Sequence, residues 1–203
     1  STATSHHRMI VCELMGNKAG WLALGAGIAG GADVILIPEI PYSPKTIAEY
    51  LTERRRSGKR FSIVALAEGA HSETKASKTS KNKKSKSKPK EDPVTRKDAE
   101  TGETYHLVDE SKASRLARQL QELTGTEARV TSLGHVQRGG VPTPTDRLLC
   151  TLLGAKAAEL LAAGHYNCMV AVRGNRCEAV PLEKVAGNLK TVPLDHEWIR
   201  AAR

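Results

Sequence analysis

The sequence predicts an α/β fold in which a parallel sheet lies between layers of helices, in a Rossmann-like, three-layer arrangement. Short apolar runs of strand length alternate with segments of helical spacing along most of the chain. The runs end at glycine, proline or charged residues, as buried parallel strands do. Only 39% of the 203 residues are hydrophobic, which indicates that one stretch does not contribute to the core.

The first part of the chain shows the strand–helix rhythm most clearly. An apolar run begins at Met9, so close to Ser1 that we expect further chain to precede it in the parent protein. The second helix has a serine cap, Ser43, followed by Pro44 at its first position. The predicted strands span 9–15, 34–37 and 61–67, and the predicted helices span 19–32 and 43–56.

A lysine- and serine-rich stretch at about 72–98 interrupts this rhythm. We expect it to be a solvated, disordered insertion, with a docking site for an acidic partner as the alternative. Eight of the nine net positive charges come from lysines between residues 75 and 90, and the rest of the chain is nearly neutral. The tract has no interleaved aromatic residues, so nucleic-acid binding is the weakest hypothesis, and we expect no nucleic-acid partner.

Regular structure is predicted again after the insertion. An amphipathic helix over 111–124, closed by Gly125, precedes a strand at 128–133. The remaining predictions are a glycine turn at 134–140, a helix at 145–163, a strand at 169–172, a turn at 173–175 and a short helix near Trp198.

Four widely spaced cysteines lie mostly in apolar runs and form no C-x-x-C pair. We expect Cys12, Cys150, Cys168 and Cys177 to be buried thiols in a reducing compartment. No apolar run reaches the roughly 20 residues that cross a bilayer, and no signal peptide is evident, which predicts a cytoplasmic protein with no membrane partner.

The turn at 134–140 is the most informative polar segment. Its adjacent glycines allow a close backbone approach, and His135 and Arg138 offer donors after a strand. This pattern suits a phosphorylated small molecule, although a glycine turn with solvated side chains fits the spacing equally well.

Other candidate binding residues follow or precede the predicted strands. Met15, Gly16 and Asn17 end the first strand before a helix, where backbone N–H groups favour an anion or a hydroxyl group. Carboxylates such as Glu68 accept sugar hydroxyls, and arginine binds phosphate bidentately. Each of these residues also fits a packing turn or a surface ion pair; the remaining candidates are Arg8 and Arg129.

Three long segments resemble consecutive blocks of the bacterial-type ATP-dependent 6-phosphofructokinases. The segments are CELMGNKAGWLALGAGIAGGADVILIPEIPY, GKRFSIVALAEGA and TSLGHVQRGGVPTPTDRLL, and the resemblance covers nearly all of the chain outside the insertion. It implies a phosphofructokinase-type fold, of which this chain is the C-terminal part.

The resemblance also implies roles for the candidate residues. Fructose 6-phosphate would be held by residues matching Met15, Gly16, Asn17, Glu68, His135 and Arg138. Arg8 and Arg129 would reach the phosphate of a neighbouring subunit's substrate, in a homotetramer. The family's effector site, less well matched, would involve Gly31, Asp33, Lys59 and Arg60. Asn17 stands where the family carries arginine, so a positive charge near the reacting phosphate is missing.

The resemblance assigns the catalytic residues elsewhere. No glycine-rich phosphate loop or acidic strand-end motif is present, so we expect Mg²⁺ and ATP to bind a missing N-terminal half and this chain alone to be inactive. Residues 1–136 would form the sugar-phosphate-binding domain, and 137–203 would pack back on the missing half. The alternatives are a pyrophosphate-dependent enzyme and a non-catalytic sugar-phosphate-binding module.

Overall fold

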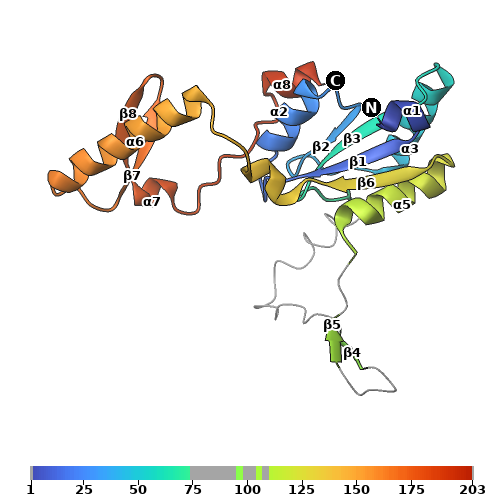
Figure 1. Cartoon of the computed structure of the whole chain (residues 1–203), viewed down its shortest axis with the longest axis horizontal. Coiled ribbons are helices and arrows are strands. Elements are labelled where there is room, and N and C mark those ends of the chain that lie inside the picture. The colour runs from blue at the N-terminus through green and yellow to red at the C-terminus, as the bar shows by residue number, and fades with distance from the viewer. Residues whose placement is uncertain (1, 74–94, 98–103, 107–109, 203) are drawn as a thin grey trace. The chain divides into compact units, whose positions relative to one another are not determined.

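A four-stranded parallel sheet forms the centre of the first part of the molecule (Figure 1). The computed structural model describes residues 2–73, 95–97, 104–106 and 110–202. The strand order is β2-β3-β1-β6, and the pairings are parallel throughout. The strands are β1 (Met9–Leu14), β2 (Val34–Leu36), β3 (Ser62–Ala67) and β6 (Ala128–Ser132).

The two central strands carry the core. Val11 of β1 and Val64 and Leu66 of β3 are completely buried, as expected for parallel strands covered on both faces. Strand β6 lies at one edge, and its residues are mostly exposed.

Three helices connect the strands: α2 (Trp21–Ala29), α3 (Pro44–Arg56) and α5 (Lys112–Thr124). Ser43 caps α3 and Ser111 caps α5, each through its hydroxyl, and Gly125 ends α5 in the left-handed conformation. Helix α2 contacts β2 and β3, whereas α3 packs against α5, which contacts β1 and β6. The chain therefore leaves β1 toward one face of the sheet and leaves β3 toward the other, as right-handed crossovers in opposite directions require.

The two ends of the chain complete this first unit. Helix α8 (Glu197–Ala201) packs on α2 and buries Ile199, and Ala3 of α1 (Thr2–His6) is also buried. By its internal contacts the chain divides into a first unit, Ser1–Gly134 with Thr191–Arg203, and a second unit, His135–Lys190. The sequence places the boundary after residue 136 and runs the second part to the C-terminus, whereas residues 191–203 belong to the first unit in the structure.

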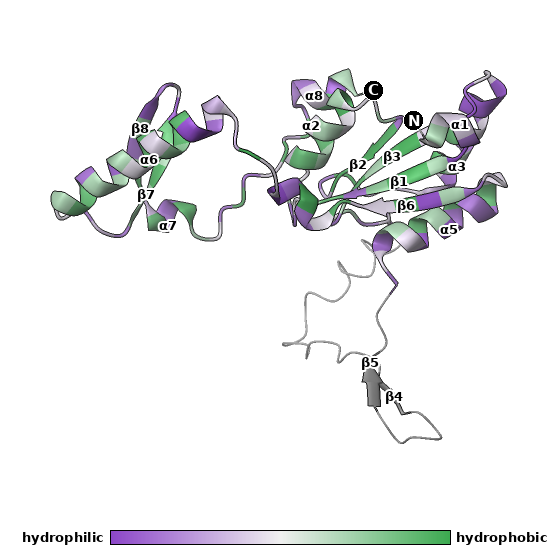
Figure 2. Cartoon of the chain, viewed as in Figure 1, coloured by the Kyte–Doolittle hydropathy of each residue, from purple (hydrophilic) through white to green (hydrophobic). Residues whose placement is uncertain are grey.

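The second unit consists of one long helix and a hairpin. Helix α6 (Pro144–Ala162) contacts the antiparallel pair β7 (Cys168–Arg173) and β8 (Arg176–Pro181), followed by α7 (Leu182–Val185). A capping box between Thr143 and Asp146 begins α6. No described residue of this unit is buried, and hydrophobic residues (green) lie along α6 in Figure 2.

The structure confirms the α/β class and corrects several details. The 134–140 turn contains a 3₁₀ helix, η1 (Gly134–Arg138). The sequence missed α1, α7 and β8, which are short or exposed and lack a buried apolar pattern. Residues 95–97, expected to be disordered, form strand β4 (Thr95–Lys97), which pairs with β5 (Thr104–His106); most of the predicted insertion lies outside the described residues.

The cysteine prediction is wrong in one respect. All four thiols are free, but Cys150 is exposed and the other three are half-buried. The apolar neighbours of Cys150 in α6 suggested a core position, yet that helix buries no side chain in this chain. Burial raises the pKa of the Cys12 thiol above its ordinary value. Among the described residues, no helix combines the length and the apolar character that crossing a bilayer requires.

Candidate functional site at the carboxyl edge of the sheet

The neighbouring strands β1 and β3 end side by side, with Leu14 opposite Ala67. Their connections depart toward opposite faces of the sheet, to α2 and to α5 (Figure 1). Ligands of open α/β sheets bind at such a point, beyond the carboxyl ends of the strands. The sequence-predicted segment 15–17 and Glu68 both lie at this point, because each directly follows one of the two strands.

The carboxylate of Glu68 holds the turn that follows β1. One of its oxygens, Oε1, accepts hydrogen bonds from the backbone N–H groups of Gly16, at 3.1 Å, and Asn17, at 2.6 Å. The backbone N–H of Glu68 donates to the Leu14 carbonyl at 2.9 Å, which extends the ladder between the strands. The two N–H groups that the sequence suggested for a ligand are thus engaged by Glu68.

The turn and the end of β3 approach each other closely at Gly69. A Cβ atom at position 69 would lie 1.7 Å from the carbonyl oxygen of Asn17, a distance that no side chain tolerates. Asn17 itself adopts a positive φ of 51°, and Gly16 a φ of 145°. The backbone path of the turn therefore depends on glycine at both 16 and 69, while the exposed Asn17 faces solvent.

Lys112, which the sequence analysis did not single out, also reaches this edge. Its Nζ donates a hydrogen bond of 2.6 Å to the backbone carbonyl of Glu68. Helix α5 returns from the carboxyl end of β3 to the amino end of β6, so its first turn must begin at the carboxyl edge. A cation in the first turn of that helix was the signal that could have identified Lys112.

Glu39, a second missed residue, follows β2 at the same edge. Its Oε1 accepts hydrogen bonds from the backbone N–H of Gly20, at 3.0 Å, and of Val192, at 2.9 Å. Its Oε2 is buried without a partner among the described residues. Glu39 thereby ties the start of α2 to the returning C-terminal segment, beside edge-to-face contacts among Trp21, His196 and Trp198.

Arg8 and Arg129 lie together at the opposite, amino-terminal edge. Both bind Glu127: Arg8 Nε lies 2.6 Å from its Oε2, and Arg129 Nη2 lies 2.7 Å from its Oε1. The hydrogen bond from Arg8 and that from Arg129 hold the pKa of Glu127 below its ordinary value. Because Arg8 precedes β1 and Glu68 follows β3, the two arginines and Glu68 stand at opposite ends of the sheet.

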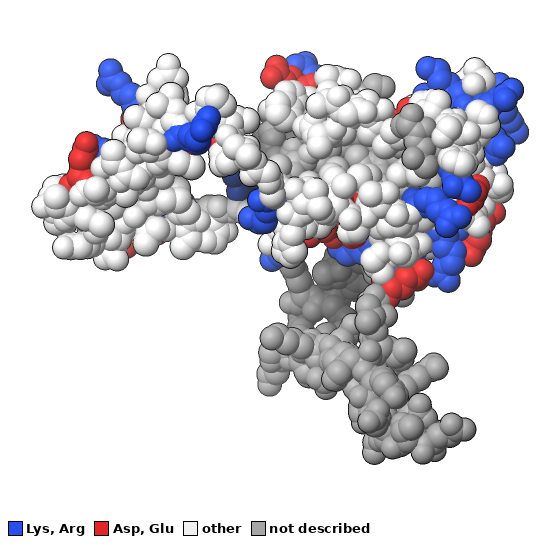
Figure 3. Space-filling model, viewed as in Figure 1, with Lys and Arg blue, Asp and Glu red and all other residues white. Residues whose placement is uncertain are grey.

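The four residues of the possible effector site also lie at the amino-terminal edge. Both carboxylate oxygens of Asp33 are engaged, one by an ion pair with Arg54 and the other by the Ile63 backbone N–H at 2.9 Å. Gly31 and Asp33 precede β2, and the exposed Lys59 and Arg60 precede β3. Figure 3 shows Lys and Arg side chains gathered at this end of the first unit. Asp33 therefore has a structural role in this chain.

His135 and Arg138 belong to the second unit, in the 3₁₀ helix η1, and both are exposed.

The described residues also limit the chemistry of the site. They contain no group of three or more His, Cys, Asp or Glu side chains that could hold a metal ion. At the carboxyl edge, Glu68 offers a carboxylate oxygen beside the backbone of the 15–17 turn, which suits a ligand that carries hydroxyl groups.

Residues 1–161 match the phosphofructokinase family. The chain belongs to this family.

Curated relatives in the phosphofructokinase family match the whole chain. An ATP-dependent 6-phosphofructokinase of Propionibacterium freudenreichii subsp. shermanii is 49% identical over 208 residues, covering 100% of this chain and 54% of the relative. An ATP-dependent 6-phosphofructokinase of Spirochaeta thermophila is 48% identical, covering 100% of this chain and 51% of the relative. The chain thus spans about half the length of the curated relatives it matches.

Solved phosphofructokinase structures share the fold. That of phosphofructokinase from Saccharomyces cerevisiae aligns with a TM-score of 0.64 and 31% identity, over 90% of this chain and 21% of the yeast chain. The pyrophosphate-dependent phosphofructokinase from Marinobacter aquaeolei aligns with a TM-score of 0.66 over 95% of this chain and 45% of that chain. At 22% identity the second likeness shows the fold alone.

Proposed function

We propose that this chain supplies the fructose 6-phosphate-binding part of a 6-phosphofructokinase, which transfers the γ-phosphate of ATP to the sugar's 1-hydroxyl group in glycolysis. The observation that carries the proposal is the meeting of Glu68 with the 15–17 turn where β1 and β3 diverge. A carboxylate at such a point accepts sugar hydroxyls. Relatives at 48–49% identity are named ATP-dependent 6-phosphofructokinases, which supports ATP as the donor.

Within this proposal each candidate residue has a role in holding the sugar or its phosphate. Glu68 orients the sugar with its second carboxylate oxygen, while Oε1 keeps the turn in place. His135 and Arg138, which belong to the second unit, bind the 6-phosphate of the sugar. Met15, Gly16 and Asn17 form the floor of the site, with the backbone path fixed by Glu68 and Gly69.

Arg8 and Arg129 serve a second copy of the site. They stand at the opposite end of the sheet from Glu68 and so do not share one sugar with it. Two arginines presented together by one carboxylate form a pair of forks suited to a phosphate group. We therefore propose that they bind the substrate phosphate of a neighbouring subunit in a homotetramer.

We assign Mg²⁺, ATP and the catalytic base to the part of the enzyme beyond this chain. The described residues offer no metal-ligand cluster, and phosphoryl transfer needs a metal and a positioned nucleophile together. This chain alone accordingly has no kinase activity and acts as the sugar-phosphate half of a cytoplasmic enzyme. Its relatives are about twice as long, which leaves room for the nucleotide half.

The second unit provides a surface for that half. Its long helix α6 exposes several leucines, of which Leu148 is 62% exposed. Apolar side chains without any buried partner are typical of an interface between domains. We propose that the second unit packs on the nucleotide-binding half in the intact enzyme.

Calorimetric titration of the chain with fructose 6-phosphate tests the sugar site. We expect Arg138→Ala to weaken binding about tenfold or more, since a charge-assisted hydrogen bond to phosphate is lost. Glu68→Gln should weaken it as well. Arg176→Ala, an exposed arginine of the hairpin β7–β8, is the matched control and should bind like the unchanged chain. Equal affinity in all four proteins would overturn the assignment.

A coupled spectrophotometric assay tests the division of labour. The chain alone should show no turnover with ATP, whereas co-expression with the N-terminal part of a relative should restore it. Turnover by the chain alone would contradict the proposal.

A non-catalytic sugar-phosphate-binding module is the second candidate, and Asn17 favours it. The family's arginine at this position is replaced by a neutral, exposed side chain whose backbone is bound to Glu68. If the reconstituted enzyme binds fructose 6-phosphate but stays inactive, and Asn17→Arg gives activity, the module is the correct interpretation. Substituting pyrophosphate for ATP in the same assay separates the pyrophosphate-dependent alternative.

A further inference from the structure

A small pocket lies beside the segment that follows β3, on the flank of α5. Its volume is about 150 Å³, and its described polar lining comprises Tyr42, His71, Ser72, Lys112, Arg115 and Gln119. That volume is about five times the roughly 30 Å³ that one water occupies in the liquid, and it is below the roughly 300 Å³ of pockets for drug-sized ligands. The pocket therefore has room for a single compact group.

Two kinds of wall enclose this pocket. On one side, residues 112, 115, 116 and 119 follow one another at helical spacing along a single face of α5. On the other side, Tyr42 pairs with the 71–73 segment: its N–H donates to the His71 carbonyl at 3.1 Å, and its carbonyl accepts from the Glu73 N–H at 3.0 Å. Paired backbone on one side and a capped helix on the other make the pocket a formed feature of the first unit.

The pocket lining is rich in donors and positive charge. Lys112 has three N–H donors, of which the Glu68 carbonyl takes one. Arg115 contributes a guanidinium group, and its positive charge opposes the rise that burial causes in the pKa of Tyr42. Among the described residues that line the pocket, none is an aspartate or a glutamate.

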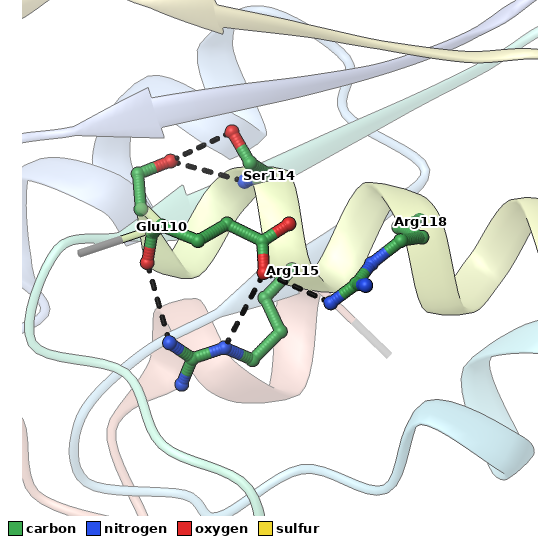
Figure 4. Close-up of polar contacts among 5 residues, drawn as sticks. Glu110, Ser114, Arg115 and Arg118 are labelled. Atoms are coloured by element: carbon green, nitrogen blue, oxygen red, sulfur yellow. Dashed lines mark hydrogen bonds and ion pairs between the residues drawn. The ribbon is translucent and has the colours of Figure 1, made fainter. Parts of the chain in front are cut away.

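Glu110 holds Arg115 in position from outside the lining. Figure 4 shows Arg115 and Arg118 directed at the same carboxylate, with Glu110 Oε2 lying 3.9 Å from Arg115 Nε and 2.9 Å from Arg118 Nη2. The Glu110 carbonyl also accepts a hydrogen bond from Arg115 Nη2 at 3.3 Å. One carboxylate shared by two arginines, beside Lys112, leaves a net positive charge around the pocket.

We propose that this pocket is a binding site for a phosphate group, free or as part of an ester. Lysine and arginine supply charge-assisted hydrogen bonds, and tyrosine, histidine and glutamine add further donors around the same space. None of its lining residues belongs to the sugar-binding set of the proposed function or to the possible effector set. Through Lys112 and the Glu68 carbonyl, the occupied pocket adjoins the carboxyl edge of the sheet.

The test is a titration of the ¹⁵N-labelled chain with inorganic phosphate, observed by amide NMR. Saturable shifts are expected at Ala70, His71 and Lys112. These amides distinguish the pocket from weak binding to the lysines between 75 and 90, which would move other signals. Shifts that are absent, or that rise linearly without saturation, would overturn the proposal.

Variants identify the side chains responsible. Replacing both cations, Lys112→Met with Arg115→Met, should weaken phosphate binding about tenfold or more, and Tyr42→Phe, which removes only a hydroxyl group, roughly threefold. Lys156→Met is the matched control, because Lys156 lies on α6 and pairs there with Glu159 at 3.0 Å. Circular dichroism checks that each variant is folded; if the double variant is not, Tyr42→Phe decides. Unchanged affinity in the folded variants would overturn the assignment.

A second arm uses fructose 6-phosphate and separates this site from the sugar site. Binding as proposed for the sugar shifts Gly16 and Asn17, which do not line the pocket. Inorganic phosphate that moves the pocket amides in the presence of saturating fructose 6-phosphate supports two independent sites. Loss of that response would mean that fructose 6-phosphate itself fills the pocket, which would overturn the proposal that the pocket is a site separate from the sugar site.

Discussion

The two units of the chain bury their apolar side chains to very different extents. In the first unit, central strands and three covering helices enclose a core that includes Leu66, Leu116 and Leu120. In the second unit, a helix of 19 residues lies on a single hairpin, and none of its described residues is buried. Both units are nevertheless rich in leucine, valine and alanine.

The difference shows what each unit needs in order to be stable. A sheet with helices on both faces removes its apolar surface from water within one chain, which provides the dominant favourable term in folding. A single helix on a two-stranded hairpin leaves most of its apolar surface in water. We infer that the first unit folds by itself, whereas the second is stabilised mainly by a partner surface. Four predictions test this comparison.

The largest expected effect comes from the same substitution in the two units. Leu66→Ala empties a fully buried position in β3 and should lower the free energy of unfolding by about 3–5 kcal/mol. Leu152→Ala changes a side chain that is 48% exposed and should change that free energy by less than about 0.5 kcal/mol. Urea unfolding followed by far-ultraviolet circular dichroism reports both. Similar losses in the two variants would mean that the second unit has a core of its own.

Ion pairs should show the same contrast with a smaller effect. Asp33 pairs with Arg54 and accepts from the Ile63 N–H, and its side chain is only 10% exposed. Asp33→Ala should lower the free energy of unfolding by about 2–3 kcal/mol, because the poorly solvated guanidinium of Arg54 and the backbone N–H of Ile63 lose their partner. Glu178→Ala breaks the exposed pair with Arg173 in the hairpin and should change stability by at most about 0.5 kcal/mol.

The same unfolding experiment measures this second comparison. If Asp33→Ala left stability unchanged, the side chain would be available as an effector ligand after all, and its structural role would be refuted.

Removing the N-cap side chain of a helix should cost about 1 kcal/mol of stability in each unit. In the first unit, Ser111→Ala removes the acceptor of the Ser114 N–H at 3.1 Å, and the loss should appear in global unfolding. In the second unit, Thr143→Ala removes the acceptor of the Asp146 N–H at 3.2 Å. Because no side chain of α6 is buried in this chain, we expect the loss of this cap to appear as faster hydrogen exchange in the first turn of α6. A drop in global stability of equal size for Thr143→Ala would disagree with that expectation.

The smallest effects concern two surface carboxyl groups, one in each unit. Hydrogen bonds from Arg8 and Arg129 lower the pKa of Glu127, and those from Thr143 lower the pKa of Asp146. Each lowered pKa adds stability at neutral pH, which is lost as the pH falls through the folded-state value.

Arg8→Met should therefore raise the pKa of Glu127 toward its ordinary value and leave Asp146 unchanged, whereas Thr143→Ala should do the reverse. Carboxyl ¹³C NMR titration measures both. A shift at the acid of the other unit would show that the two units communicate.

Much of the first unit was predictable because its periodic pattern and its turn chemistry agree. Strands at 9–15, 34–37 and 61–67 and the helix at 43–56 are confirmed to within one or two residues. The helix predicted over 19–32 is shorter, Trp21–Ala29, because glycines at both of its ends favour loops. In the second unit, β8 escaped prediction because its side chains alternate without a buried face.

The site was predictable only in part, and for a definite physical reason. Glu68 and the 15–17 turn are brought together as expected, because parallel strands end at one edge. Lys112, Glu39 and Glu127 act through contacts with segments far away in the sequence, at separations of 44, 153 and 119 residues. Local patterns do not encode such pairings, and only the cation in the first turn of α5 pointed to Lys112. The roles of His135 and Arg138 stay predictions.

The near-contact between Gly69 and the Asn17 carbonyl has a consequence for how this sequence can vary. A methyl group at position 69 would push the loop after β1 away from the loop after β3. Glu68 would then lose its hydrogen bonds to the backbone N–H groups of Gly16 and Asn17. Random mutagenesis coupled to selection for growth on a hexose should therefore recover only glycine at position 69. The exposed position 17 should accept more substitutions, although its positive φ disfavours β-branched residues and proline. Because glycine has only a hydrogen atom as its side chain, Gly69 allows the two loops to stay in contact.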